Sequence, residues 1–160
     1  MDYAVATFNG LSGVNGYVLI KPTPTGVLVS ASFDKLPPGE HGFHIHKSGD
    51  LRGEGCQGAC EHYNKGPPSD HGGPKTKVRH TGDLGNISDA PCKKRYHLEN
   101  VTIADLYGRS IIVHEDRDDL GKGQHEDSKS TGHSGKRIAC AIIGRASMPQ
   151  CAKKTLKAKK

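Results

Sequence analysis

The hexapeptide His41-Gly42-Phe43-His44-Ile45-His46 constrains this chain more than any other stretch. In an extended strand, side chains two residues apart point to the same face, so His44 and His46 would present two imidazoles side by side. Imidazole pairs of this kind suit zinc, copper, iron or nickel. The pair alone is a weak indication, because buried histidines that only form hydrogen bonds are common. It gains weight from the residues of ligand type that follow it, namely His62, His71, His80, Asp83 and His114. The sequence therefore predicts a metal site.

The segment after this hexapeptide, residues 47–79, has no hydrophobic periodicity and is rich in Gly, Pro, Asp and Ser. A loop of this length inside a compact domain is usually functional or disordered. The histidines spaced through it favour a functional loop, and loops held by a metal need no core of their own. A second polar loop with several glycines is expected over residues 115–136.

Short alternating segments predict the secondary structure. The clearest strand is 26–34, in which apolar residues at 27, 29, 31 and 33 alternate with mostly polar ones. Residues 89–96 are expected to form a basic, cysteine-bearing loop, and residues 98–106 alternate again. Further short strands are expected at 3–8, 14–21, 39–46, 80–86, 109–114 and 138–143. About eight short strands with two long loops predict an antiparallel sandwich or barrel.

Length and charge limit the number of domains and the kind of partner that the chain could bind. The 160 residues are enough for one domain, expected at 1–150, with a Lys-rich tail at 151–160. The tail holds five of the 23 basic residues and no acid, so the remaining 18 basic residues nearly balance the 17 acidic ones. The basic character of the chain is thus a property of the tail. A solvated tail is favoured over a polyanion contact.

No secretory signal or membrane span is recognisable. The first residues lack a basic and then apolar pattern, and no apolar run approaches the ~20 residues of a membrane helix. A cytoplasmic location is therefore expected, and reduced thiols would be the default for the cysteines. The five cysteines cannot all pair internally; they are Cys56, Cys60, Cys92, Cys140 and Cys151.

Six segments in the same order resemble the copper–zinc superoxide dismutases, and the resemblance spans roughly residues 3 to 145. The segments are Gly42-Phe43-His44-Ile45-His46, His71-Gly72-Gly73-Pro74, Arg79-His80-Thr81-Gly82-Asp83-Leu84-Gly85-Asn86, Val113-His114-Glu115, Asp118-Asp119-Leu120-Gly121-Lys122-Gly123 and Gly135-Lys136-Arg137-Ile138-Ala139-Cys140. The resemblance implies an all-β fold, an eight-stranded Greek-key antiparallel β-barrel with two long functional loops.

The resemblance also implies the cofactors, one copper and one zinc per chain. His62 would serve both metals as a bridging imidazolate, and Asp118 would tie a copper histidine to a zinc histidine. The implied copper ligands are His44, His46, His62 and His114, and the implied zinc ligands are His62, His71, His80 and Asp83.

The implied activity is the conversion of two superoxide anions and two protons to O2 and H2O2, by alternate reduction and reoxidation of copper. Arg137 would dock superoxide and His62 would carry a proton. Cys56 and Cys140 match the intrasubunit disulfide of the family, whereas the other three cysteines have no match and are expected to be free thiols. A homodimer and a copper-delivery partner are further implied.

The chain departs from the family pattern in several places. One residue more than usual separates His62 from His71, and the stretch before Gly108 is about six residues shorter, which weakens the implication of a dimer. Ser130 stands where the family has a lysine that attracts the substrate, with Lys129 one place earlier. Three histidines, His97, His125 and His133, are expected to be solvated, whereas His41 could brace the loop near the copper.

Two other hypotheses remain beside the enzyme. One is a non-catalytic dismutase-like module that binds copper or acts as a decoy, and the other is a copper-delivery domain that docks on a true dismutase. The first would be favoured by a missing copper ligand or a missing arginine, and neither is missing here. The second would be favoured by an incomplete copper set and a separate thiol metal site, which Cys60 and Cys151 are not arranged to supply. A nucleic-acid partner is disfavoured because only the lysine tail supports it and stacking aromatics are absent beside it.

Overall fold

The structure, a computed structural model, describes residues 1–147. The expected Lys-rich tail at 151–160 and the end of the expected domain lie outside the described residues. Within the described part no helix is long and apolar enough to cross a membrane.

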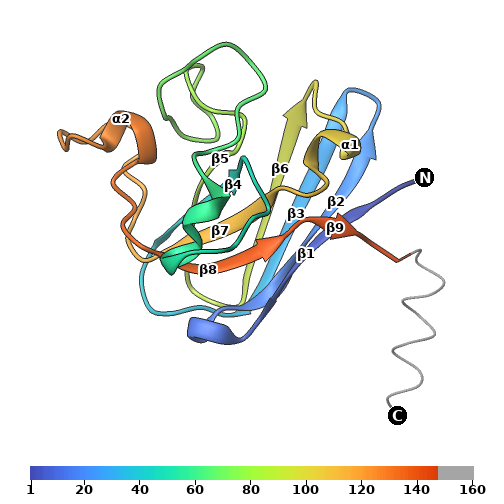
Figure 1. Ribbon diagram of the computed structural model, residues 1–160, viewed down its shortest axis with the longest axis horizontal. Helices are drawn as coiled ribbons and strands as arrows, with labels where there is room; N and C mark the ends of the chain where they lie inside the picture. Colours follow the sequence, from blue (N-terminus) through green and yellow to red (C-terminus); the bar gives the residue numbers. More distant parts are fainter. Residues whose placement is uncertain (148–160) are drawn as a thin grey trace.

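Within residues 1–147, nine strands form two antiparallel sheets (Figure 1). The first sheet has the order β6-β3-β2-β1-β9 and consists of β6 (Cys92–Glu99), β3 (Gly26–Lys35), β2 (Asn15–Thr23), β1 (Ala4–Asn9) and β9 (Gly144–Arg145). The second has the order β5-β4-β7-β8 and consists of β5 (Asp83–Ile87), β4 (His41–His46), β7 (Ser110–His114) and β8 (Arg137–Ile142). The chain crosses between the sheets after β3, β5, β6 and β8. The predicted all-β Greek-key class is confirmed, with the two-residue β9 added to the eight strands.

The core lies between the two sheets and draws apolar residues from both. Alternation along β3 buries Val27, Val29, Ala31 and Phe33, as the sequence predicted. Across the core, Phe33 meets the ring of Phe43 from β4 edge-on, with ring centroids 5.8 Å apart. Burial of such apolar surface contributes about 25 cal/mol per Å² and holds the sheets together.

Strand β4 is buried on both of its faces. Phe43 and Ile45 belong to the core, so the alternation of the strand turns His44 and His46 to the opposite face. The long loops cover that face. Glycine at position 42 allows the second loop to pack closely on the strand. A Cβ there would clash with Ser134 of that loop, at 2.6 Å from its Oγ. The hexapeptide therefore presents its histidines beneath loops and not to open solvent.

Two expectations about the segment between residues 89 and 106 are wrong. Residues 92–96 of the expected basic loop belong to β6, which is an edge strand. Its Lys93, Lys94 and Arg95 are all exposed, so the sequence shows no alternation there. The alternation expected over residues 98–106 does not continue as a strand, because its last part forms the short helix α1 (Ile103–Leu106). Thr102 caps this helix: its side chain accepts from Asp105 N–H, and the Asp105 carboxylate accepts in return from Thr102 N–H.

Short helical segments lie in the loops. The first long loop contains η2 (Glu54–Ala59), the second contains α2 (Ser128–Thr131), and η1 (Leu11–Gly13) joins β1 to β2. The first loop returns to β4, because Tyr63 N–H donates to Ile45 O at 2.8 Å and Ile45 N–H donates to Gly82 O at 2.9 Å. The loop histidines are thereby brought to the outer face of β4.

Candidate metal centre

Four imidazoles converge on the outer face of the second sheet. His44 and His46 come from β4, His114 ends the neighbouring strand β7, and His62 forms a bridge with His46 from the first loop. All four are buried, and one nitrogen from each lies within 4.8 Å of the others. We call His44, His46, His62 and His114 the four-imidazole group.

A second group of ligand type, also within 4.8 Å, consists of His62, His71, His80 and Asp83. Asp83 begins β5 and pairs with His44 of β4, which places its fully buried carboxylate beside the first group. Its Oδ1 lies 2.8 Å from His62 Nδ1 and 2.9 Å from His71 Nδ1. We call these four residues the carboxylate group.

His62 is the residue that the two groups share. Its Nδ1 faces Asp83, whereas its Nε2 is buried with no hydrogen-bond partner. Each nitrogen of one ring is thus turned to a different group. This is the geometry that a ligand of two ions requires.

In three further histidines of the two groups, one ring nitrogen contacts a backbone carbonyl and the other points toward the group. His46 Nδ1 lies 2.8 Å from Cys60 O, His114 Nδ1 lies 3.2 Å from Gly135 O, and His80 Nε2 lies 2.8 Å from Ser69 O. Such outer bonds fix the orientation and tautomer of a metal-binding histidine. These backbone acceptors were not predicted, because a carbonyl leaves no signal in the sequence.

Asp118 lies between the two groups and contacts a ring of each. Its fully buried carboxylate lies 2.8 Å from His44 Nε2 and 2.7 Å from His71 Nε2. Asn86 holds Asp118 in turn, since its Oδ1 accepts from Asp118 N–H at 2.7 Å and its Nδ2 donates to Asp118 O at 2.9 Å. Asn86 was part of a quoted motif but had no predicted role.

Buried nitrogens without partners show that the residues fit bound metal ions. His44 Nδ1, His62 Nε2 and His71 Nδ1 have no hydrogen bond and are inaccessible to solvent. Leaving such an atom unsatisfied costs about 1–3 kcal/mol. His71 Nδ1 lies 2.9 Å from Asp83 Oδ1 without hydrogen-bond geometry, as two ligands of one ion would. The donor types, four imidazoles in one group and three imidazoles with a carboxylate in the other, suit copper and zinc.

The four-imidazole group remains neutral at physiological pH. Burial, followed by repulsion between the rings, lowers the pKa of His44 and of His46 well below the usual value. Burial also lowers the pKa of His62, and it lowers that of His114 to about 3. Neutral imidazole is the form that binds a metal.

The carboxylate group has the opposite protonation behaviour. Burial lowers the pKa of His71, but the hydrogen bond to Asp118 and the close negative charge of Asp83 outweigh it and raise the pKa to about 9. The hydrogen bond to Asp83 likewise raises the pKa of His80. For Asp83, burial is outweighed by the close contacts with His62, His71 and His80, which hold its pKa far below the usual range. The buried negative charge of Asp83 and Asp118 therefore favours positive charge in this group.

A cavity of about 500 Å³ opens above the four-imidazole group. Its lining includes His46, His62, His114 and Arg137. The Arg137 guanidinium donates to Cys56 O at 2.8 Å and to Cys60 O at 2.6 Å. These two bonds use two of its five N–H groups, so donors remain for an anion in the cavity.

The disulfide Cys56–Cys140 is formed, which confirms the pairing implied by the resemblance. It joins the first loop to β8, the strand that begins with Arg137. Of the other cysteines that the structure describes, Cys60 is exposed and Cys92 is buried, and both are free.

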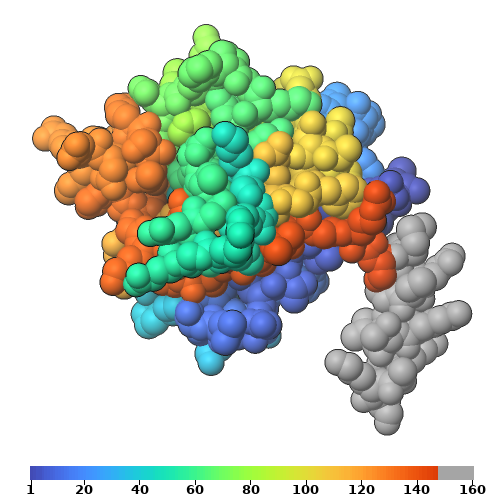
Figure 2. All heavy atoms as spheres, in the orientation of Figure 1, coloured from blue at the N-terminus to red at the C-terminus, as the bar shows by residue number. Residues whose placement is uncertain are grey.

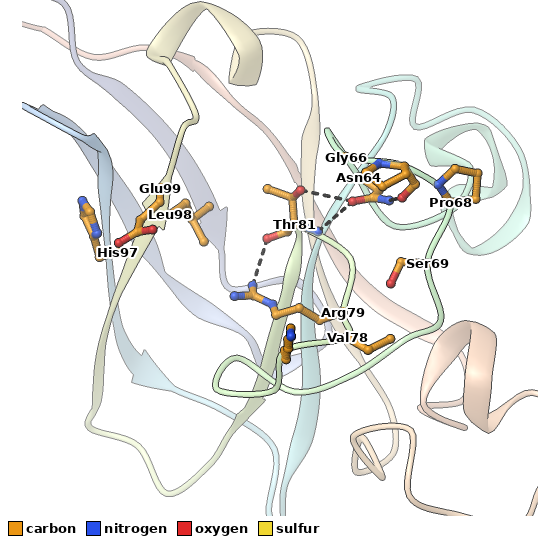
Figure 3. A pocket seen from close by; sticks show the side chains of 12 residues that line it. Asn64, Gly66, Pro68, Ser69, Val78, Arg79, Thr81, His97, Leu98 and Glu99 are labelled. Carbon is orange, nitrogen blue, oxygen red and sulfur yellow. Dashed lines mark hydrogen bonds between the residues drawn. The ribbon is translucent and has the colours of Figure 1, made fainter.

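A larger cavity, of about 760 Å³, lies between the first loop and the end of β6 (Figure 3). None of its lining residues belongs to either group. Arg79, at its wall, donates to the carbonyls of Thr81 and Asp83 and so stabilises the turn that leads to the buried carboxylate. Figure 3 also shows Asn64 Oδ1 accepting from Thr81.

His41 lies outside both groups and braces the second loop, as its position suggested. Its Nδ1 lies 2.9 Å from His114 O and 3.0 Å from Glu115 O, and its Nε2 lies 3.1 Å from Pro37 O.

Comparison with known proteins agrees with this arrangement. Residues 14–143 match the family described as Copper/zinc superoxide dismutase (SODC). The chain is 43% identical over 147 residues to the human protein "Copper chaperone for superoxide dismutase", covering 89% of this chain and 53% of the human one. It is 42% identical over 155 residues to "Superoxide dismutase [Cu-Zn]" of Paramecium bursaria Chlorella virus 1, covering 92% of this chain and 81% of the viral protein.

The pig copper chaperone is 41% identical over 150 residues, covering 91% of this chain and 54% of the pig protein. The chain thus spans about half the length of the mammalian relatives it matches. Among solved structures, the clock protein EA4 superposes with a TM-score of 0.76 at 37% identity, covering 89% of this chain and 93% of that one. With the family match extending over most of its residues, the chain belongs to the copper/zinc superoxide dismutase family.

Proposed function

We propose that the chain is an active superoxide dismutase, which converts two superoxide anions and two protons to O2 and H2O2. The observation that carries this proposal is the complete four-imidazole group beneath a cavity that Arg137 also lines. A site with all its ligands, solvent access and an anion-binding side chain has what the reaction needs.

The two groups would hold different ions. The four-imidazole group would bind copper, and the carboxylate group would bind zinc in a closed tetrahedral shell of three histidines and Asp83. When bound, copper supplies the redox change of the reaction. Zinc has no redox chemistry and supplies a constant positive charge beside the ring of His62. One copper and one zinc per chain are proposed.

Arg137 would bind the substrate. A guanidinium stays charged at every physiological pH and presents several donors in one plane, which suits a small anion. Its bonds to Cys56 O and Cys60 O fix the plane of the group beside the cavity. Cys60 O also accepts from His46 Nδ1, so one carbonyl positions both the arginine and a ring of the four-imidazole group.

His62 would handle a proton. Its Nε2 has no acceptor within the protein, and the residue lines the cavity. A proton held on this nitrogen could therefore be given to the reduced substrate as peroxide forms. Asp83 on the Nδ1 side keeps the ring oriented while Nε2 takes up and gives back the proton.

A copper-delivery domain is the second candidate. It is favoured by the similarity to mammalian copper chaperones, each matched over about half its length. In that case the chain would hand its copper to another protein and leave superoxide unchanged. A non-catalytic copper-binding or decoy module would do neither. The complete ligand set and Arg137 favour the enzyme. A homodimer and a copper-delivery partner for this chain are proposed with it.

One experiment separates these functions. The chain, loaded with copper and zinc, is mixed with superoxide in a stopped-flow instrument and, separately, with a metal-free dismutase. The proposal predicts rapid superoxide loss that is catalytic in protein. Copper transfer to the second protein without superoxide loss would establish delivery instead. Light scattering on the same sample tests the homodimer.

A further inference from the structure

A cavity of about 540 Å³ lies where the two sheets meet at β5 and β6, and none of its lining residues belongs to either metal group. Its lining includes residues 84–86 of β5 and 94–98 of β6. Within residues 1–147, β5 pairs with β4 alone and β6 with β3 alone, so no strand ladder closes the space between them. The volume is in the range of small-molecule sites, about 300–1,000 Å³. We call this the seam cavity.

Three leucines line the seam cavity. Leu84 and Leu98 are buried. Leu120 comes from the second long loop, which forms the orange lobe in Figure 2. Leu98 and Arg79 also line the larger neighbouring cavity, where Figure 3 shows both side chains. The seam cavity therefore offers apolar surface to the body of a small organic molecule.

Four cationic side chains also line the seam cavity, and they are Lys75, Arg79, Lys94 and Arg95. Within residues 1–147 none of the four forms an ion pair with a carboxylate. Arg79 donates to three backbone carbonyls, which carry no net charge. Glu40 is the one acidic residue of the lining, and it is already paired with Arg117 at 2.7 Å. The excess of positive charge favours an anion.

Two donors of the lining have no acceptor. Arg79 Nε and Tyr96 Oη are buried and have no hydrogen-bond partner. In the part of the chain that the structure describes, only three other buried side-chain atoms are in this state, and all three are histidine nitrogens of the metal groups. An arginine N–H can only donate. Burial raises the pKa of Tyr96, so its hydroxyl keeps its proton and can donate as well.

We propose that the seam cavity binds a small organic carboxylate with an apolar body, of the medium-chain fatty acid type. The two oxygens of a carboxylate can accept from Arg79 Nε and Tyr96 Oη together, after a small rotation of each side chain. Lys94 and Arg95, which are exposed on β6, add positive charge beside the carboxylate. The hydrocarbon chain lies against the three leucines. This binding requires neither metal nor turnover.

The test titrates octanoate into the full chain, with both metal groups loaded, by isothermal calorimetry. The wild-type protein is expected to bind one equivalent, and to bind octanol, which has the same chain length without the charge, roughly 10-fold more weakly or less. Tyr96→Phe keeps the ring and removes the hydroxyl, and it should weaken octanoate binding by roughly 10-fold. The double variant Lys94→Gln/Arg95→Gln should also weaken it. Lys93→Gln changes an exposed lysine of β6 outside the lining and should bind as the wild type does.

Absence of octanoate binding in the wild-type protein would overturn the proposal. Equal affinities for octanoate and octanol would do so too, because the carboxylate would then not be recognised. Octanoate binding that Arg137→Lys weakens, and that Tyr96→Phe and the double variant leave unchanged, would assign the ligand to the cavity above the four-imidazole group and would also overturn it. Circular dichroism of each variant verifies that the fold is retained.

Discussion

The carboxylate of Asp118 lies 2.8 Å from Nε2 of His44, and both side chains are fully buried. The second oxygen of the same carboxylate is 2.7 Å from His71 Nε2. One side chain therefore orients a ring in each group. Removing its charge should weaken both sites at once, although Asp118 belongs to neither proposed ligand set.

Asp118→Asn tests this relationship. Because an amide cannot accept from both rings, the affinities for copper and for zinc should each fall by about 10–100-fold. Competition with a chelator of known affinity measures both constants. Asp34→Asn, which changes an exposed carboxylate on β3, should leave them unchanged. A variant that lost affinity for only one metal would show that the two groups are not joined through Asp118.

The substitution His62→Ala should affect both groups. Since one ring serves both groups, the variant is expected to lose superoxide consumption and to bind zinc more weakly. Activity and zinc content are measured on the same sample, with His97→Ala as the control. Full activity in His62→Ala would contradict the assignment of a shared ring.

Arg137→Lys should separate anion binding from metal binding. An ammonium cannot bond Cys56 O, Cys60 O and a bound anion in one plane. A hydrogen bond to a charged group contributes about 1.5–3 kcal/mol, so superoxide consumption should fall by roughly 10–100-fold. Metal content should stay unchanged. An azide titration of the copper-loaded variant, followed by absorbance, should show a matching loss of affinity, and equal azide affinities would contradict this role.

The metal-free protein should be most stable near pH 6.5. The four-imidazole group has lowered pKa values in the folded state. Below about pH 6.5 the unfolded chain therefore binds protons that the folded chain cannot, and stability is lost as the pH falls toward the folded values. His71, with a raised pKa, contributes stability that is complete below pH 6.5 and is lost as the pH rises through about 9.

Urea unfolding of the metal-free protein at pH 5, 6.5 and 9 measures this dependence. The free energy of unfolding should be highest at pH 6.5. Loading with copper and zinc should reduce the loss on the alkaline side, because the ion replaces the proton that His71 holds. A free energy that rises steadily from pH 6.5 to pH 5 would contradict the pKa shifts.

Cys60 has a backbone conformation that favours glycine. Its φ is 61° and its ψ is −150°, a region that side chains with a Cβ rarely adopt. Such a residue costs of order 1–3 kcal/mol, so Cys60→Gly should raise the free energy of unfolding by about that amount. Cys60→Ser keeps the Cβ and should leave stability unchanged. Equal stabilities for the Gly and Ser variants would show that the strain is absent.

The sequence predicted the parts of the fold whose pattern is local. Alternation in residues 26–34 predicted β3, and His44 and His46 two residues apart predicted a shared face. It did not predict β6, because on an edge strand Lys93, Lys94 and Arg95 can all face water and the alternation is hidden. The helix α1 was missed although Thr102 and Asp105 have the spacing of a capping box.

For the site, the histidines and Asp83 follow one another in the same order as in the family. This order predicted which side chains would lie close together. The outer bonds could not be predicted, because Cys60 O and Gly135 O are backbone atoms whose positions depend on how the loops fold. In the second loop the rings of His125 and His133 stack with centroids 3.6 Å apart, a contact that was also missed. Its residues are separated by a short helix whose existence the polar loop did not indicate.

The most direct test of the central claim measures metal content and superoxide consumption on one sample. The chain is loaded with copper and zinc, freed of excess metal, analysed for both elements and then mixed with superoxide. The account predicts one copper and one zinc per chain, together with rapid catalytic consumption. Both metals bound at these ratios with no turnover would contradict it.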